Sequence, residues 1–259
     1  VEHRKMERLT IVKVGGNVIN DAKALEEFLV DFAALKGHKI LVHGGGKRAT
    51  KLAEDLGLEA TMINGRRVTD SATLEIVTMV YAGLLNKNIT ASLQKFNCNA
   101  LGLSGADGDS IQAHKRKVTD VDYGYAGDVD GINAENISTF IEGQMTPVFC
   151  AITHDTQGQL LNTNADTIAS TIAVGMSALY QVSLIYTFEK NGVLRSIEDE
   201  NSVITDIDLN KYDGLKKEGV IADGMLPKME NCFDALKKGV SEVIVGNPTV
   251  IKNKEHNCI

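Results

Sequence analysis

The sequence predicts an α/β fold, a three-layer αβα sandwich around a mainly parallel sheet, with two lobes that share this sheet. Short apolar runs, many of them β-branched, alternate with segments of helical spacing over most of the 259 residues. The connections between them are short, which favours strand–helix–strand units with helices on both faces. Two expected strands end directly in glycine clusters. A soft boundary divides the chain into an N-terminal lobe, 1–175, and a C-terminal lobe, 176–259.

The first hundred residues alternate strand and helix. Asn64-Gly65 predicts a hairpin turn inside the extended stretch Thr61–Val68. Asp70 can cap a helix that runs into the early eighties, and a further helix is expected to end near Phe96. The other expected elements are strands at Leu9–Val14, Lys39–Val42 and Ala100–Leu103, and helices at Ala22–Leu35 and Arg48–Leu56.

The rest of the chain continues this alternation after one excursion. The Gly- and Asp-rich stretch 108–131 is expected to form a β-hairpin outside the main sheet. The elements expected beyond it are strands at Pro147–Ile152, at the end of Asp155–Leu161, at Gln181–Tyr186 and at Glu242–Val245, and helices at Glu135–Glu142, Ala165–Gly175 and Leu226–Lys238.

The composition excludes several classes of protein. The net charge of −7 argues against a nucleic acid as the main partner, since phosphate backbones demand a basic face. The longest apolar runs are strand-sized, far short of the ~20 residues that a membrane helix needs. The first ten residues contain no apolar signal-peptide core. The four cysteines lack metal or redox spacing. We therefore expect a cytoplasmic protein with a small-molecule partner, and neither a nucleic acid nor a membrane.

Two glycine clusters, K-V-G-G-N at 13–17 and H-G-G-G-K at 43–47, follow expected strands. Glycine lets the backbone approach an anion closely, and amides at a helix N-terminus point toward negative charge. On adjacent parallel strands the two loops would converge and form a phosphate cradle from Gly15, Gly16 and Gly44. Ordinary β–α turns are the alternative. The P-loop pattern, the dinucleotide fingerprint and the protein-kinase motifs are absent.

Lys13 stands two residues before Gly15 in an otherwise apolar strand. A lysine in such a strand is costly unless it has a partner. A cation that faces a phosphate fits this position better than a surface lysine at the end of a strand.

Three further motifs follow in the chain: N-G-R-R-V-T-D at 64–70, L-N-T-N-A-D at 161–166 and I-A-D-G-M-L-P-K at 221–228. With the glycine clusters, they resemble the amino acid kinase family over roughly residues 8–246. Asn64–Thr69 and the pair Asn162/Asp166 are similar to the branch that acts on N-acylated glutamate. The resemblance implies a carbamate-kinase-like fold. It also implies transfer of the γ-phosphoryl group of ATP to the side-chain carboxylate of N-acetyl-L-glutamate in arginine biosynthesis, with Mg²⁺ held mainly by the nucleotide phosphates.

The resemblance also implies roles for individual residues. Lys13 and Lys228 would neutralise charge on the transferring phosphoryl group, and Asp166 would orient both lysines. Such transfer needs alignment and charge stabilisation more than covalent help. No general base is required, because a carboxylate of pKa ~4 is already ionised at neutral pH. The implied substrate-binding residues are Gly45, Gly46, Arg67 and Asn162.

The nucleotide-binding part departs from the family pattern. The family's Thr/Ser-Asp-Val-x-Gly loop has Phe188 in place of the hydroxyl residue and Glu189 in place of the aspartate. Glu189 keeps an acidic contact on a longer arm, while Phe188 packs either against the nucleotide or in the core. Family members usually have another helix after the last strand, and we expect this helix to be absent here. The implied nucleotide contacts are Thr187, Phe188, Glu189, Asn191, Gly192, Val193, Val220, Ile221 and Ala222.

Three alternatives stay open from the sequence. The substrate could be N-succinyl-L-glutamate or the acid of another amino acid kinase. Phe188 and the short C-terminus also fit a catalytically inactive regulatory protein that binds nucleotide or ligand, although retention of Lys13, Asp166 and Lys228 argues against it.

Arginine-inhibited family members carry an extra N-terminal helix, and only about eight residues precede the first strand here. We therefore expect an arginine-insensitive homodimer.

Overall fold

A six-stranded parallel sheet forms the centre of the molecule in the computed structural model, which describes residues 6–63, 65–196, 198–221, 225–252 and 259. Every neighbouring pair of strands in this sheet is parallel, so the predicted fold class is confirmed. In spatial order the strands are β12 (Glu242–Gly246), β11 (Gln181–Thr187), β1 (Arg8–Val14), β2 (His38–His43), β8 (Thr146–Phe149) and β5 (Ala100–Leu103).

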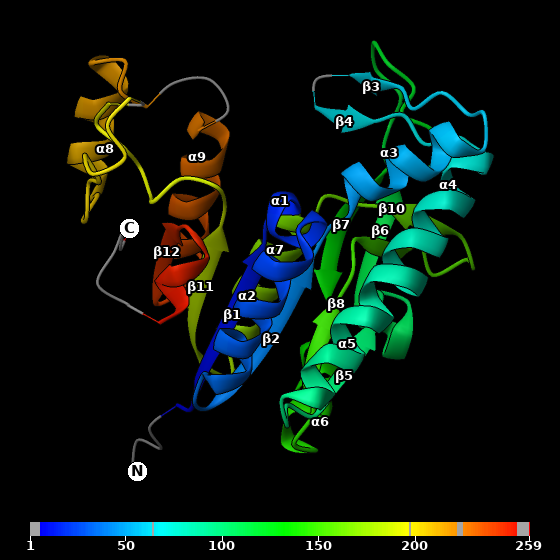
Figure 1. The fold of residues 1–259 in the computed structure, drawn as a ribbon, viewed down its shortest axis with the longest axis horizontal. Helices are drawn as coiled ribbons and strands as arrows, with labels where there is room; N and C mark the ends of the chain where they lie inside the picture. Colours follow the sequence, from blue (N-terminus) through cyan, green and yellow to red (C-terminus); the bar gives the residue numbers. More distant parts are fainter. Residues whose placement is uncertain (1–5, 64, 197, 222–224, 253–258) are drawn as a thin grey trace.

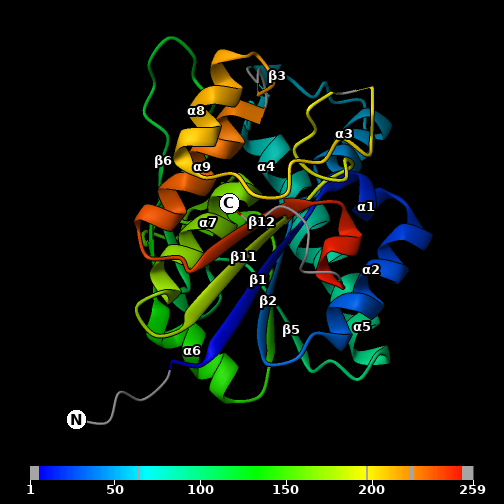
Figure 2. The ribbon, with the colours of Figure 1, turned by 90° about the vertical axis from the view of Figure 1, so that its left-hand side faces the viewer.

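Helices cover both faces of the sheet (Figures 1 and 2). Figure 2 shows α1, α2 and α5 on one side of the central strands and α6, α7 and α9 on the other. Each strand therefore has two buried faces, which explains its nearly continuous apolar sequence. These helices are α1 (Gly16–Asn20), α2 (Ala22–Ala34), α5 (Asn86–Lys95), α6 (Ala134–Glu142), α7 (Ala165–Met176) and α9 (Met225–Lys237).

Strand β1 divides its side chains between the two helical layers. Leu9 and Ile11 belong to the core cluster that includes α7, whereas Val12 and Val14 belong to the cluster that includes α2. Because side chains alternate along a strand, Lys13 lies on the same face as Ile11. The lysine therefore points toward α7.

One continuous helical stretch runs from residue 71 to 95, where the sequence predicted two separate helices. It consists of α4 (Ser71–Thr78), the π-helix η1 (Met79–Leu85) and α5. The predicted cap at its start is confirmed, since the Asp70 carboxylate accepts a hydrogen bond from the Thr73 amide at 2.8 Å. π-helical turns inside α-helices are frequent at functional sites, and this one lies beside the second glycine cluster.

Two smaller sheets lie next to the main one. The predicted hairpin excursion is confirmed as β6 (Ile111–Lys115) and β7 (Gly127–Ile132), which pair antiparallel. The predicted strand 147–152 is in fact two strands, because the chain leaves the main sheet after β8 and enters the second sheet at β9 (Ile152–His154). The remaining elements here are β10 (Leu160–Asn162), the pair β3 (Met62–Ile63) and β4 (Arg66–Arg67), and the helix α3 (Gly46–Asp55).

The hairpin of β3 and β4 was expected from Asn64-Gly65, and its antiparallel pairing is confirmed. Asn64 itself lies outside the described residues.

The C-terminal part contains a helix that the sequence did not predict. Helix α8 (Leu209–Lys217) carries few apolar residues, but Tyr212 and Leu215 are buried in a cluster with Met229 and Phe233 of α9. Tertiary packing therefore supports a helix with a weak apolar pattern. The expected loop after β12 contains a 3₁₀ turn, η3 (Pro248–Ile251). Within the described ranges, every helix is too short or too polar to cross a bilayer.

Candidate active site

The two glycine clusters lie side by side at the carboxyl edge of the main sheet. Strands β1 and β2 are parallel neighbours, and Val14 pairs with His43, so both clusters begin at the same level. The predicted convergence of the two loops is therefore confirmed.

The two glycines after β1 differ in what surrounds them. The Gly15 amide donates to Thr187 Oγ1 at 3.4 Å, and a Cβ on Gly15 would stand 2.9 Å from the Thr187 carbonyl oxygen. Gly15 thus allows β1 and the end of β11 to approach each other. Gly16 is exposed, and a Cβ there would meet no heavy atom within 4 Å. Of these two predicted phosphate ligands, Gly16 faces open space, whereas Gly15 lies in the contact between β1 and β11.

The middle glycine of the second cluster is enclosed by the helical stretch above it. A Cβ on Gly45 would stand 2.6 Å from Leu85 Cδ1 and 2.7 Å from Tyr81 Cδ1. Gly44 and Gly46 have more room, since their nearest such contacts are at 3.8 and 3.9 Å. The π-helix η1 therefore requires a glycine at position 45 and leaves its two neighbours open to a ligand.

His43, the last residue of β2, holds the second glycine cluster in place through hydrogen bonds. It is fully buried; its Nε2 accepts from Asn86 Nδ2 at 3.0 Å, and its Nδ1 donates to the Gly44 carbonyl at 2.8 Å. Burial lowers the pKa of His43 to about 4, so the imidazole is neutral at physiological pH. The neutral ring has one donor and one acceptor, and both are used to join the glycine loop to α5.

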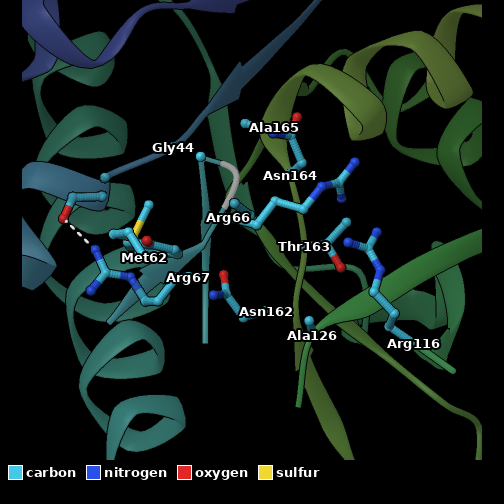
Figure 3. A pocket seen from close by; sticks show the side chains of 15 residues that line it. Gly44, Met62, Arg66, Arg67, Arg116, Ala126, Asn162, Thr163, Asn164 and Ala165 are labelled. Carbon is cyan, nitrogen blue, oxygen red and sulfur yellow. Dashed lines mark hydrogen bonds between the residues drawn. The ribbon is translucent and has the colours of Figure 1, made fainter. Parts of the chain in front are cut away.

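A cavity of about 210 Å³, here called the arginine cavity, opens beside Gly44–Gly46 (Figure 3). The Arg67 guanidinium is buried and donates through Nη2 to the Gly46 carbonyl at 3.0 Å and to Thr50 Oγ1 at 2.8 Å. Asn162 lines the same cavity and donates to Thr69 Oγ1 at 2.9 Å. The structure thus brings together all four predicted substrate-binding residues, which are Gly45, Gly46, Arg67 and Asn162.

Sequence reasoning missed several side chains of the arginine cavity. Tyr81 comes from η1, and burial raises the pKa of its phenol, which remains a hydrogen-bond donor. Arg116 directly follows β6. Its Nε donates to both carboxylate oxygens of Asp128, each at 3.1 Å, and this holds the guanidinium in place. Neither residue lies in a motif, so no local signal marked them. Arg66, the neighbour of Arg67 in the chain, also lines the cavity.

A second cavity, of about 350 Å³ and here called the lysine cavity, lies beside the first glycine cluster. Lys13 points into the α7 layer as its strand position predicts, and its Nζ lies 2.9 Å from Asp166 Oδ1. Three lysines and one glutamate contribute charge to its wall, which consists of Lys13, Gly15, Gly16, Asn17, Val18, Lys47, Thr187, Phe188, Glu189 and Lys190.

Asp166 belongs to the first turn of α7. The Asn164 side chain caps this helix by accepting from the Asp166 amide at 2.8 Å and the Thr167 amide at 3.1 Å. Negative charge in the first turn of a helix interacts favourably with the helix dipole. Asn164 and Ala165 line the arginine cavity, while Asp166 holds Lys13 of the lysine cavity. Residues at the N-terminus of α7 therefore line one cavity and hold a lysine of the other.

Lys228, from the first turns of α9, is the second cation near Asp166. Its Nζ lies 4.8 Å from the centre of the Phe188 ring, which is a cation–π distance. Burial lowers the pKa of Lys228, the Asp166 carboxylate acts in the opposite direction, and the Lys13 ammonium adds to the lowering. Lys13, Asp166 and Lys228 thus form one electrostatic cluster, and their catalytic roles remain a prediction.

Some of the predicted nucleotide contacts line the lysine cavity and others do not. Phe188 and Glu189 line the lysine cavity, and so does Thr187, which is buried and donates to the Lys13 carbonyl at 3.1 Å. Among the described residues expected to contact nucleotide, those that do not line the lysine cavity are Asn191, Gly192, Val193, Val220 and Ile221.

Four of these five residues have other neighbours. Val193 and Ile221 are buried in the cluster around α8, and Val220 packs against it. Asn191 donates to the Glu200 carbonyl at 2.9 Å and accepts from Asn247 at 2.6 Å. Ala222 lies outside the described residues. Their contact with a nucleotide remains a prediction.

Comparison with known proteins places this site in a family. The model of the amino acid kinase family matches residues 8–247. An acetylglutamate kinase of Bacteroides thetaiotaomicron is 51% identical over 249 residues, which cover 96% of this chain and 97% of the relative. An acetylglutamate kinase of Cytophaga hutchinsonii is 51% identical over 241 residues, which cover 93% and 91%.

A solved structure extends the similarity to the fold. The carbamate kinase of Giardia lamblia bound to AMP-PNP superimposes with a TM-score of 0.68 over 98% of both chains. At 13% identity this likeness concerns the fold alone. The family model and the two relatives cover nearly all of the described sheet and both cavities, and the chain therefore belongs to the amino acid kinase family.

Proposed function

We propose that this protein transfers the γ-phosphoryl group of ATP to the side-chain carboxylate of N-acetyl-L-glutamate, giving N-acetyl-L-glutamyl 5-phosphate for arginine biosynthesis. Relatives about half identical over nearly the whole chain are named acetylglutamate kinases, which supports this substrate. The observation that carries the proposal is the cluster of Lys13, Asp166 and Lys228 at the first turns of α7 and α9. Two cations held by one carboxylate suit a reaction in which negative charge moves between phosphate oxygens.

In this proposal the arginine cavity holds the acylated amino acid. Arg67 binds the α-carboxylate, because a planar guanidinium matches a carboxylate fork. Asn162 contacts the same end of the substrate and its amide. The side-chain carboxylate then lies near Gly44 and Gly46, whose open faces allow close approach to the transferring group. Binding both reactants in adjoining cavities would supply the alignment that phosphoryl transfer needs.

The proposed reaction is a direct displacement. A side-chain carboxylate oxygen of the substrate forms a bond to the γ-phosphorus, the bond from that phosphorus to the β-phosphate oxygen breaks, and ADP leaves. The substrate carboxylate is already ionised at neutral pH, so no proton has to be removed. Lys13 offsets charge on the transferring group and Lys228 offsets charge on the leaving side, while Asp166 holds both ammonium groups in place.

The lysine cavity would bind the nucleotide phosphates through Lys13, Gly15 and Gly16. Mg²⁺ commonly binds substrate phosphates with few protein ligands. Within the described part of the chain, no three His, Cys, Asp or Glu side chains are arranged to hold a metal ion. These residues do not fit a dedicated metal site, so we propose that Mg²⁺ arrives on the nucleotide.

The organisation of the chain in this proposal follows the sequence prediction. Residues 1–175 would bind the acylated amino acid and form a homodimer, and residues 176–259 would bind ATP. The cytoplasmic location and the homodimer are further proposals, and sedimentation at micromolar concentration tests the oligomeric state. A hexamer would contradict it.

A coupled ADP-release assay tests the proposed function. Its substrates are N-acetylglutamate, N-succinylglutamate, aspartate and glutamate. We expect ADP release with N-acetylglutamate and little with the unacylated acids. Nucleotide binding without ADP release from any substrate would instead support a catalytically inactive regulatory protein.

N-succinyl-L-glutamate remains a second candidate substrate for one specific reason. Arg66 and Arg116 line the arginine cavity in addition to Arg67, and Figure 3 shows both side chains extending to the side of the cavity away from Arg67. A succinyl group carries a carboxylate that an acetyl group lacks. Higher kcat/KM with the succinyl compound, lost selectively in Arg66→Ala, would favour this substrate. Equal loss with both compounds would exclude an acyl-recognition role for Arg66.

A further inference from the structure

Lys47 has a position that the family resemblance does not explain. It directly follows the H-G-G-G cluster and is the second residue of α3. Its ammonium group donates to Asn17 Oδ1, and Asn17 is the second residue of α1. This hydrogen bond spans the two glycine loops. Both side chains line the lysine cavity together with Lys13 and Gly16.

We propose that Lys47 is a third phosphate-binding cation of this site, which contacts the terminal phosphates of the nucleotide, and that Asn17 is a positioning residue for it. This inference rests on the proposed kinase function and adds a residue to its nucleotide site.

The charges around the lysine cavity support this role. Lys13 is paired with Asp166 at 2.9 Å, and Lys190 approaches Glu200 at 3.8 Å. In the described part of the chain, Lys47 has no carboxylate within ion-pair distance, and its Asn17 partner is neutral. Asn17 therefore fixes the direction of the ammonium group without cancelling its charge. An anion bound in the cavity would supply the missing opposite charge.

The position of Lys47 in the first turn of α3 also supports a phosphate-binding role. The first turn of α3 contains no acidic residue, and Lys47 is followed there by Arg48. Cations near a helix N-terminus oppose the helix dipole, so this arrangement costs stability in the free protein. A bound phosphate would reverse the sign of that interaction. Lys47 is exposed and lines the cavity, so its ammonium group is accessible to an anion that enters there.

Lys51, one turn further along α3, offers a matched control. Its ammonium group is paired with Asp55 at 2.7 Å in an exposed i,i+4 ion pair. Lys51 does not line the lysine cavity. Replacement of either lysine removes one positive charge from the same helix, but only Lys47 faces the proposed phosphates.

The test measures both turnover and direct nucleotide affinity in Lys47→Met, Lys47→Arg, Asn17→Ala and Lys51→Met. We expect the KM and Kd for ATP to rise roughly tenfold to a hundredfold in Lys47→Met, the range of a lost charge-assisted hydrogen bond. Lys47→Arg should recover most of this loss, and Lys51→Met should resemble the wild type. The KM for the acylated amino acid should stay within about twofold in all four.

Asn17 is tested by non-additivity. If it acts through Lys47, Asn17→Ala weakens ATP binding less than Lys47→Met does, and the double variant is no weaker than Lys47→Met alone. Additive losses would show that Asn17 acts independently. Thermal unfolding of each variant checks that the fold is intact.

Failure of this inference is distinguishable from failure of the proposed function. Unchanged ATP affinity in Lys47→Met, or an equal loss in Lys51→Met, would overturn the role of Lys47 while ADP release by the wild type remained. If the wild type released no ADP with any acid, the kinase proposal would fail. The ATP affinities measured by calorimetry would still decide whether Lys47 binds phosphate.

Discussion

The Nζ atom of Lys13 lies 2.9 Å from Oδ1 of Asp166, an ion pair that joins the end of β1 to the first turn of α7. Strand alternation sends Lys13 to the α7 face, and the Asn164 cap fixes where α7 begins. The pair therefore follows from local structure at both ends. It also sets the position of a carboxylate that faces a second cation, Lys228.

Phe188 is expected to keep Lys228 charged. Its ring faces the ammonium group at 4.8 Å, which offsets part of the burial that lowers the pKa of Lys228. In Phe188→Leu this offset is lost and the pKa falls further, so the alkaline decline of kcat should move to lower pH. Phe188→Tyr should keep the wild-type profile. The pH dependence of kcat, measured for the wild type and both variants, tests this prediction. Identical profiles for the wild type and Phe188→Leu would show that Phe188 does not keep Lys228 charged.

Arg67 is expected to determine the affinity for the acylated amino acid. Arg67→Lys keeps the charge but loses the planar fork, so the KM for that substrate should rise roughly tenfold or more, with little change in the KM for ATP. Arg48→Ala is the control, because Arg48 is exposed and does not line the arginine cavity. With N-acetylglutamate it should change KM by about twofold or less. Equal effects of the two substitutions would contradict the assignment of Arg67.

His43 is expected to make stability depend on pH. Burial lowers its folded-state pKa to about 4 from an ordinary value of 6.5, so the unfolded chain takes up the proton first as the pH falls. The stabilising contribution is complete above the unfolded pKa and is lost between about pH 6.5 and 4. From pH 7.5 to 5 this loss should be about 2 kcal/mol.

Urea unfolding at several pH values measures the His43 contribution. A His43→Gln variant keeps one donor and one acceptor but cannot titrate, so its stability should fall less over that range than the stability of the wild type. Parallel pH dependence in the two proteins would show that other groups are responsible.

Gly45 is expected to tolerate no side chain. In Gly45→Ala the new methyl group would overlap the side chains of Tyr81 and Leu85, and overpacking of this kind costs roughly 1–3 kcal/mol. Gly16→Ala is the matched control, since a Cβ there meets nothing within 4 Å and should leave stability nearly unchanged. Thermal unfolding compares the two. A Gly45→Ala variant as stable as the wild type would mean that η1 moves away easily.

The main sheet and its glycine loops could be predicted because their signals are local. Apolar runs and the clusters at 13–17 and 43–47 lie within a few residues of the structures they form. The contact between Phe188 and Lys228 could not be predicted, since it joins residues 40 positions apart whose approach depends on how α9 packs. The resemblance left Phe188 open between nucleotide and core, and its ring in fact lies beside a catalytic candidate.

The structural features that the sequence did not predict also depend on contacts between distant residues. Helix α8 has a polar sequence with an internal glycine, and its apolar contacts come from distant residues such as Met229 and Phe233. The π-helix η1 has no sequence signature in the apolar stretch 79–85, yet it supplies Tyr81 to the arginine cavity. Arg116 reaches that cavity through a hairpin outside the main sheet. Each of these features depends on tertiary contacts that no short motif encodes.

The most direct test of the account compares wild type, Lys13→Ala and Lys228→Ala for kcat of ADP release and for calorimetric binding of N-acetylglutamate. If the two ammonium groups stabilise the transferring phosphoryl charge, each substitution should lower kcat roughly a hundredfold to a thousandfold. Binding of N-acetylglutamate should stay within about twofold, because neither lysine lines the arginine cavity. Variants that bind normally and turn over within about threefold of the wild type would contradict the central role of this cluster.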